Sequence, residues 1–172
     1  MVFEQSSSYL VGAVTKRYTA KLAGKGYIFG IKFRPGGFHA LTQLQVSDFT
    51  DSKLEISDIF KSDGKKLIDD IRQAKGIEQM QSISETFLQA KLPESFDDVT
   101  QLETIINEIH SNPKVMKVAD LSERFFISER ALQRLFKHQV GVSPKWAIRK
   151  CRIQEVLSQL CLLYTSPSPR DS

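Results

Sequence analysis

The sequence predicts an α+β fold, in which a small β-rich N-terminal domain with helices precedes an all-α module. Two observations support this prediction: apolar residues alternate along the first part of the chain, whereas they recur with helical spacing from residue 57 onward. The 172 residues, 41% of them apolar and 26% charged, suffice for one or two globular domains. This composition excludes the disordered, collagen-like and disulfide-rich classes of protein.

The β-rich part is predicted from three short alternating segments. Segment 26–33 places one set of side chains on a half-buried face and a second set on the opposite face. The first set is Tyr27, Phe29, Ile31 and Phe33, and the second set is Ile28, Gly30 and Lys32. Segments 9–14 and 17–22 predict shorter strands, and residues 23–26 are few enough for a hairpin turn.

A turn at residues 34–37 ends the last of these strands. Pro35 lacks the N–H that a strand donates to its neighbour, and Gly36 and Gly37 permit positive φ. Because no Lys-Ser/Thr pair follows the two glycines, we interpret them as a plain turn and not as a phosphate-binding loop.

Helical periodicity predicts three helices in the middle of the chain. The first has the apolar stripe Leu67, Ile68, Ile71 and Ala74, and the second has the stripe Met80, Ile83, Phe87, Leu88 and Leu92. The spacing of Ser82 and Glu85 predicts a capping box at the start of the second helix, and Pro93 ends it. The third helix is predicted over Val99–His110.

Composition and the positions of helix-breaking residues divide the chain into four parts. Residues 1–92 are predicted to form a regulatory or sensor-like domain, residues 93–98 a linker, and residues 99–160 a helical module. Residues 161–171 read Cys-Leu-Leu-Tyr-Thr-Ser-Pro-Ser-Pro-Arg-Asp, which is the translation of a transposase mosaic-end sequencing adapter. We therefore expect residues 161–172 to be a disordered, adapter-derived tail.

Two short helices separated by a tight turn are predicted within the helical module. Val118, Ala119, Leu121 and Phe125 share one face of the first helix. The pattern breaks at residues 126–127, and Ser128 then supplies an N-cap for the second helix. This arrangement predicts a helix-turn-helix, followed by a long linker helix.

The second short helix has a polar face that suits DNA. Its buried stripe is Leu132, Leu135, Phe136 and Val140, and its opposite face carries Arg130, Gln133, Arg134 and Lys137. Arginine can donate two hydrogen bonds to guanine and glutamine can pair with adenine, so such a helix can read base edges in the major groove. Residues 113–160 contain ten basic and four acidic side chains, an excess typical of polyanion binders. A solvated polar face would explain these charges, but not the adjoining short helix and turn.

The linker helix begins at a clear boundary. Gly141 ends the preceding helix, and Ser143 and Pro144 occupy the N-cap and first positions of the new one. Its apolar residues, all predicted to be buried, are Trp146, Ile148, Ile153, Val156, Leu157 and Leu160. The cations left for the outside, where they can contact phosphates, are Lys145, Arg149, Lys150 and Arg152.

Residues 118–160 resemble the first half of the DNA-binding domain of AraC/XylS-type transcription regulators. The resemblance rests on the pattern S-x-R-x-L-Q-R-x-F-K at residues 128–137, followed by V-G-V-S-P-K. It implies that double-stranded DNA is the partner and that Arg130, Gln133 and Arg134 face the bases. Ser128, Lys137, Lys145 and Arg149 complete the predicted DNA-binding set.

The segment YIFGIKFRPGGF at residues 27–38 looks like a motif in the N-terminal domain that precedes some AraC-type modules. That likeness implies a β-rich regulatory domain, a small-molecule effector, and a homodimer formed through this domain in a full-length parent. Two departures stand out. Phe126 occupies a turn position where the family has Gly or Asn, and nothing after Leu160 can form the family's second helix-turn-helix.

Two alternatives remain open beside DNA binding. Some AraC-like modules are fused to alkyl-transfer DNA repair domains, but Cys151 has apolar helix neighbours and no partner histidine in the sequence, so a packing thiol is preferred. His39, His110 and His138 are scattered and predict no general base. Since neither the cysteine nor the histidines indicate a catalytic group, we predict no enzymatic activity.

The other alternative is a small-molecule-binding or protein-interaction module whose basic helices never contact DNA.

Cysteine usage and hydropathy predict a cytoplasmic protein without a cofactor. Cys151 and Cys161 lie ten residues apart without a CxxC motif, which indicates neither a zinc site nor a disulfide framework. Every long apolar stretch is interrupted by charge, and the N-terminus lacks a basic start followed by an apolar run. Neither a membrane span nor a signal peptide is expected, and no catalytic or metal-binding residue is predicted.

Overall fold

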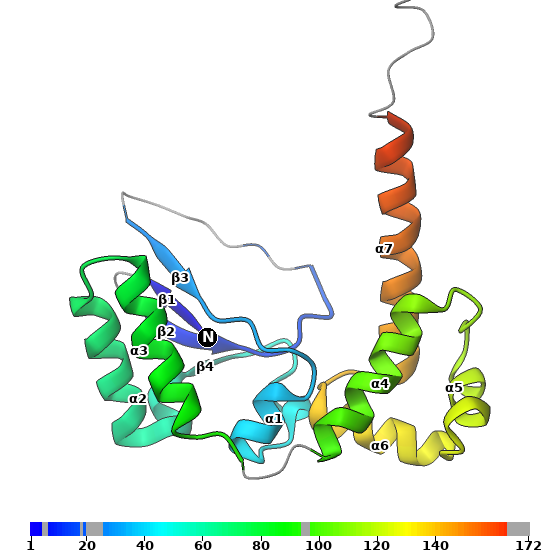
Figure 1. Cartoon of the computed structure of the whole chain (residues 1–172), viewed down its shortest axis with the longest axis horizontal. Coiled ribbons are helices and arrows are strands. Elements are labelled where there is room, and N and C mark those ends of the chain that lie inside the picture. The colour runs from blue at the N-terminus through cyan, green and yellow to red at the C-terminus, as the bar shows by residue number, and fades with distance from the viewer. Residues whose placement is uncertain (5–6, 18, 20–25, 94–96, 165–172) are drawn as a thin grey trace, which may run out of the picture.

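The computed structural model describes residues 1–4, 7–17, 19, 26–93 and 97–164, and these form an α+β fold, as the sequence predicts. The described strands form an antiparallel sheet in the order β3-β1-β2-β4 (Figure 1). They are β1 Val2–Glu4, β2 Ser8–Val11, β3 Ile28–Gly30 and β4 Lys53–Glu55. Helix α1 (Gly37–Thr42) and the 3-10 helix η1 (Val46–Phe49) lie between β3 and β4 in the chain. The later helices are α2 Ile56–Gln73, α3 Ile77–Gln89, α4 Asp97–Ser111, α5 Val118–Phe125, α6 Glu129–Gln139 and α7 Pro144–Tyr164.

The sheet and the two helices after it enclose a first hydrophobic core. Strand pairing brings Phe3 opposite Phe29 and Leu10 opposite Leu54. Of these side chains, Phe3, Phe29 and Leu10 are buried. Helix α2 packs against β2 and β4, and α3 packs against α2. Further buried members of this core are Phe38, Val46, Ile56, Phe60, Leu67, Ile71 and Met80. The predicted stripes of α2 and α3 therefore face this core.

The strands are shorter than predicted. The segment expected at 26–33 is a strand only over Ile28–Gly30, because its partner β1 pairs with it through three residues. Tyr27 is 45% exposed and does not join the buried face, whereas Ile31 and Phe33 pack against the core from beyond the strand. The strand expected at 9–14 is β2, Ser8–Val11.

Two other local predictions have different outcomes. Residues 18 and 20–25, which hold most of the predicted strand 17–22 and its hairpin turn, lie outside the described residues. The turn at 34–37 is present, with Gly36 at φ 82° and Gly37 as the first residue of α1.

The capping box predicted at Ser82 is wrong, because α3 begins five residues earlier, at Ile77. The Gln79 side chain accepts a hydrogen bond from the Lys75 N–H at 2.9 Å, which satisfies a donor just before the helix. Ser82 lies inside the helix, and its carbonyl accepts from the Thr86 hydroxyl. The predicted stripe also includes Leu92, which lies past the end of α3 and is half exposed.

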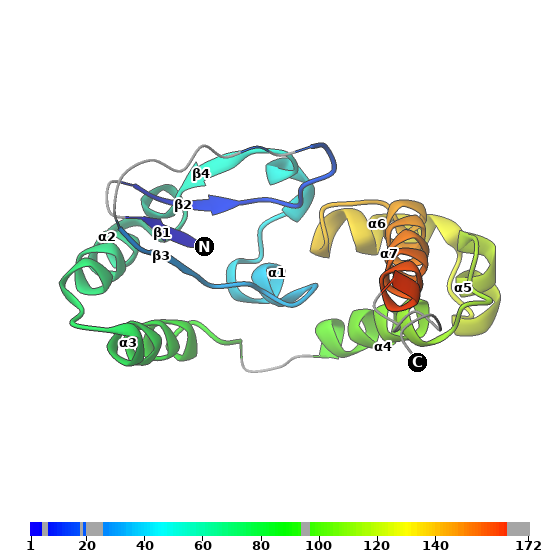
Figure 2. The ribbon, with the colours of Figure 1, turned by 90° about the horizontal axis from the view of Figure 1, so that it is seen from above.

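Helices α4 to α7 enclose a second hydrophobic core. Its buried members are Leu102, Ile105, Ile109, Val115, Leu121, Leu132, Phe136, Ile148 and Cys151. Helix α7 packs against α4 and α6 with its first half only, and its second half projects away from the other helices (Figures 1 and 2). The prediction that its whole apolar set is buried is therefore wrong. Ile148 is buried and Trp146 is partly buried, but 45–54% of each of the following side chains is exposed: Ile153, Val156, Leu157 and Leu160.

The Met1 amino group is expected to make the stability of the fold depend on pH. This amine donates a hydrogen bond to the Ile31 carbonyl at 2.7 Å, and burial lowers its pKa from 8.0 to about 6. Between pH 6 and pH 8 the folded protein therefore binds fewer protons here than the unfolded chain does. We expect the free energy of unfolding to rise through this window by on the order of 2 kcal/mol.

Urea titrations across this pH range measure the effect. An N-terminally acetylated chain is the matched control, because it has no amine to titrate but keeps the three histidines, which also change charge near this pH. Identical pH dependence in the two forms would contradict the prediction.

Candidate nucleic-acid interface

The turn between α5 and α6 is built around a strained residue. Phe126 has φ 53° and ψ 36°, the left-handed conformation that an L-residue adopts at a cost of about 1–2 kcal/mol. The Ile127 N–H donates to the Ser122 carbonyl at 3.2 Å, which closes the turn. The Phe126 side chain is 96% exposed. The bend predicted ahead of Ser128 is therefore present, with phenylalanine held where glycine would be unstrained.

Side-chain caps fix the start of each short helix. The Ser128 hydroxyl accepts a hydrogen bond from the Ala131 N–H at 3.2 Å, as predicted for an N-cap. At α5, the Asp120 carboxylate accepts from the Met116 and Lys117 N–H groups at 2.8 and 2.9 Å. These two hydrogen bonds lower the pKa of Asp120. The caps hold α5 and α6 at defined starting points on either side of the turn.

Helix α6 buries one side and leaves the predicted DNA-facing side chains in solvent. Leu132 and Phe136 are fully buried, and Leu135 and Val140 are partly buried. The exposed side chains are Arg130, Gln133, Arg134 and Lys137. Within the described part of the chain, no acidic side chain forms an ion pair with these three cations. Their donors are therefore available to an external acceptor.

The cations of α7 fall into two classes. Lys145 and Arg149 are exposed and, among the residues described, pair with no acidic group. The Lys150 ammonium group lies 4.8 Å from the centre of the Trp146 ring, a cation–π contact. The prediction that Arg152 points outward is wrong, because its guanidinium group donates to Glu155 and to the Ile109 carbonyl of α4. Arg152 thus joins α7 to α4.

The C-terminal end of α6 contacts the β-rich part of the chain. Gly141, at φ 85°, accepts a hydrogen bond at its carbonyl from the Thr50 hydroxyl at 2.6 Å. A Cβ atom at this residue would lie 3.0 Å from Val46. The rings of His39 and His138 meet edge to face with centroids 5.5 Å apart. Helix α1 and η1 therefore lie against the end of α6 that is farther from Ser128 (Figure 2).

A hollow of about 400 Å³ lies where α1, α4 and α6 meet. Arg134 and His138 of α6 line it, together with His39 of α1 and Gln101 of α4. Arg134 thus borders both the free face of α6 and this hollow.

The surroundings of Cys151 differ from the prediction. Its Sγ lies 3.3 Å from Nδ1 of His110, so the expectation that this cysteine has no partner histidine is wrong. The contact joins α4 to α7 across 41 residues of sequence, which residue spacing cannot reveal. The thiol is nevertheless buried and also donates to the Ile109 carbonyl.

The described residues contain neither a three-membered cluster of the usual metal ligands nor a membrane-spanning helix. Within them, no three His, Cys, Asp or Glu side chains are grouped so that they could hold a metal ion. Likewise, none of the helices described combines the length and the apolar character needed to cross a membrane.

Comparison with known proteins identifies only the first third of the chain. A family model described as a domain of unknown function (DUF6597) matches residues 1–55. This match takes in β1 to β4, α1 and η1 and stops at the last residue of β4, so it includes none of the predicted DNA-binding residues. The comparisons with curated proteins and with solved structures find no match.

Proposed function

We propose that the chain belongs to a sequence-specific transcription regulator of the AraC type and that α6 reads the major groove of double-stranded DNA. The observation that carries this proposal is the free face of α6, where Arg130, Gln133, Arg134 and Lys137 are exposed directly after a capped turn. An α-helix fits the major groove, and these side-chain types pair with guanine, adenine and phosphate. The match of residues 1–55 to the uncharacterised domain is compatible with an AraC-type N-terminal domain.

The exposed polar side chains have two roles in this proposal. Arg130, Gln133 and Arg134 would discriminate between bases, whereas Lys137, Lys145 and Arg149 would contact phosphates and contribute affinity without sequence information. Binding should weaken steeply as salt increases, because phosphate contacts release counterions. We further propose a cytoplasmic setting, from the cysteine usage, and a homodimer formed through the N-terminal part of a full-length parent, as the resemblance implies.

A selection from a random double-stranded DNA library tests the proposal. We expect an enriched motif, and we expect Arg134→Ala to weaken binding to that motif by about 10- to 100-fold while binding to unrelated DNA changes much less. Gln133→Ala should relax the preference at one base position. Fluorescence anisotropy with labelled duplexes measures both effects.

Arg72→Ala is the matched control, because Arg72 is an exposed arginine in the last turn of α2, remote from α6 in the sequence. It should leave the affinity for the motif unchanged. If no motif is enriched, or if Arg134→Ala and Arg72→Ala have equal effects, α6 does not read DNA.

A further inference from the structure

We propose that the hollow where α1, α4 and α6 meet binds one divalent transition-metal ion through the imidazoles of His39 and His138. Both side chains line this hollow, which has a volume of about 400 Å³. His39 belongs to α1 and His138 to α6, so the ion would join the β-rich part of the chain to the helical module. Such an ion would bind whether or not α6 reads DNA.

The separation of the two histidine rings suits a shared metal ion. Their centroids lie 5.5 Å apart and their planes meet at 89°. Two imidazoles bound to one ion at about 2.1 Å, with a tetrahedral angle between them, have centroids about 5 Å apart. His138 is exposed, and among the described residues its ring has no hydrogen-bond partner. The ring can therefore turn toward an ion without breaking a hydrogen bond.

The His39 ring is held in the tautomer that suits a metal ligand. Its Nδ1 lies 2.7 Å from the Leu44 carbonyl oxygen. Because a carbonyl oxygen can only accept, Nδ1 carries the proton and donates it, and Nε2 of the neutral ring keeps its lone pair. Histidines that bind metals usually donate their second ring nitrogen to a carbonyl or a carboxylate in this way, which orients the ring. Nε2 of His39 is therefore the nitrogen that would bind the ion.

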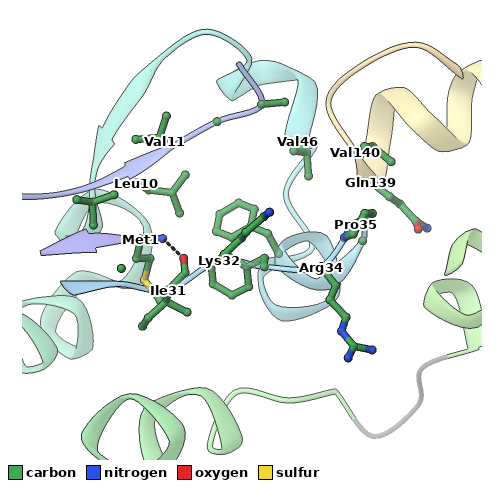
Figure 3. A pocket seen from close by; sticks show the side chains of 17 residues that line it. Met1, Leu10, Val11, Ile31, Lys32, Arg34, Pro35, Val46, Gln139 and Val140 are labelled. Atoms are coloured by element: carbon green, nitrogen blue, oxygen red, sulfur yellow. Dashed lines mark hydrogen bonds between the residues drawn. The ribbon is translucent and has the colours of Figure 1, made fainter. Parts of the chain in front are cut away.

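A buried oxygen atom without a partner borders the same hollow. Gln139 lines the hollow and is only 7% exposed, and its Oε1 accepts no hydrogen bond within the described structure. Gln139 also borders the cavity drawn in Figure 3, but there its amide group points away from Leu10 and Val46. A buried oxygen that accepts no hydrogen bond costs free energy, which a bound cation would recover. Gln139 Oε1 is therefore a third ligand for the ion.

The types of ligand favour late transition metals over magnesium and calcium. Imidazole nitrogens suit Ni²⁺, Cu²⁺ and Zn²⁺, whereas Mg²⁺ and Ca²⁺ prefer carboxylates and water. Among the described residues that line the hollow, none is an aspartate or a glutamate. Arg134 lines it as well, and its positive charge opposes a bound ion, but its side chain is exposed and can extend into solvent. With two imidazoles, one amide oxygen and water as ligands, we expect micromolar affinity.

Isothermal titration of the full chain with Ni²⁺ and with Mg²⁺ tests the site. We expect saturable binding of Ni²⁺ and none of Mg²⁺. His138→Ala should weaken Ni²⁺ binding by about tenfold or more. His39→Asn should do the same, although the asparagine amide can still donate to the Leu44 carbonyl, so this variant separates the metal ligand from the hydrogen bond. His110→Ala is the matched control, because it removes an exposed histidine outside the hollow, and it should change the affinity less than about twofold.

Gln139→Glu tests the third ligand by a gain of affinity. The substitution keeps the shape of the side chain and replaces the amide by a carboxylate, which binds transition metals more strongly than an amide oxygen does. We expect Ni²⁺ to bind this variant about tenfold more tightly than it binds the unchanged chain. Because a tighter site cannot result from a loss of folding, this variant complements the histidine substitutions. An unchanged affinity would show that the ion does not reach Gln139 and that the hollow is not its site.

Absence of saturable Ni²⁺ binding would overturn the proposed site. So would binding that His39→Asn and His138→Ala leave unchanged. If His110→Ala weakens binding as much as His138→Ala does, the ion lies beside Cys151 and not in the hollow, which also overturns the site. None of these titrations contains DNA, so their failure would leave the proposed function untouched, and failure of the DNA selection would leave the metal site standing.

Discussion

Replacing Phe136 by alanine is expected to destabilise the helical module by about 3–5 kcal/mol. Phe136 is fully buried in the second core, where it packs in one cluster with Leu102, Leu121 and Leu132. Truncating a buried phenylalanine removes its transfer free energy and leaves a cavity that the surrounding side chains fill only in part. Because Phe136 lies on the buried side of α6, its loss should also loosen the placement of the exposed side, which carries Arg130 and Arg134.

Trp146 provides a specific probe for this effect. It is the only tryptophan of the chain and belongs to α7, so its fluorescence in a urea titration reports on the helical module and not on the sheet. Phe126→Ala is the matched control, because it truncates the same residue type at an exposed position of the same module. We expect it to change the free energy of unfolding by less than about 0.5 kcal/mol. Equal effects of the two substitutions would show that Phe136 does not lie in a packed core.

The helix-turn-helix could be predicted from sequence because its signals are local. Ser128 caps α6, Gly141 follows α6 in a left-handed conformation, and Pro144 is the first residue of α7. Each of these residues acts on the backbone within one helical turn of its own position. The helical period then assigns the polar face, so the exposure of Arg130 and Gln133 follows from the buried stripe opposite them.

Features that depend on distant residues could not be predicted in this way. Periodicity shows that the apolar residues of α7 after Arg152 share a helix, but it does not show whether another element covers them. The pairing of Cys151 with His110 and the hydrogen bond from Thr50 to Gly141 join residues 41 and 91 positions apart. A single sequence carries no signal for either contact, so both the environment of Cys151 and the contact of Thr50 with the end of α6 appear only in three dimensions.

Replacing Gly12 by alanine is expected to lower the free energy of unfolding by about 3 kcal/mol, an effect close to that of Phe136→Ala. A Cβ atom at this position would lie 1.7 Å from the Phe49 carbonyl oxygen and 2.5 Å from its carbonyl carbon. No side chain can rotate to relieve this clash, because both contacts are with backbone. The Gly12 N–H also donates to the Ser52 carbonyl at 3.1 Å, so separating the two segments breaks a hydrogen bond as well.

The clash would displace Phe49 and the residue after it, which contacts the end of α6. The substitution therefore has a second readout in the helical module. Phe49 ends η1, and the next residue, Thr50, holds the Gly141 carbonyl. Gly12→Ala should therefore lower the urea midpoint measured by circular dichroism and, because Thr50 contacts the end of α6, also the midpoint measured by Trp146 fluorescence. Gly30→Ala is the matched control, since a Cβ there would come no closer than 4.0 Å to Met1 in the same sheet. If Gly12→Ala is as stable as Gly30→Ala, the backbone just after β2 does not approach the end of η1 as closely as the structure has it.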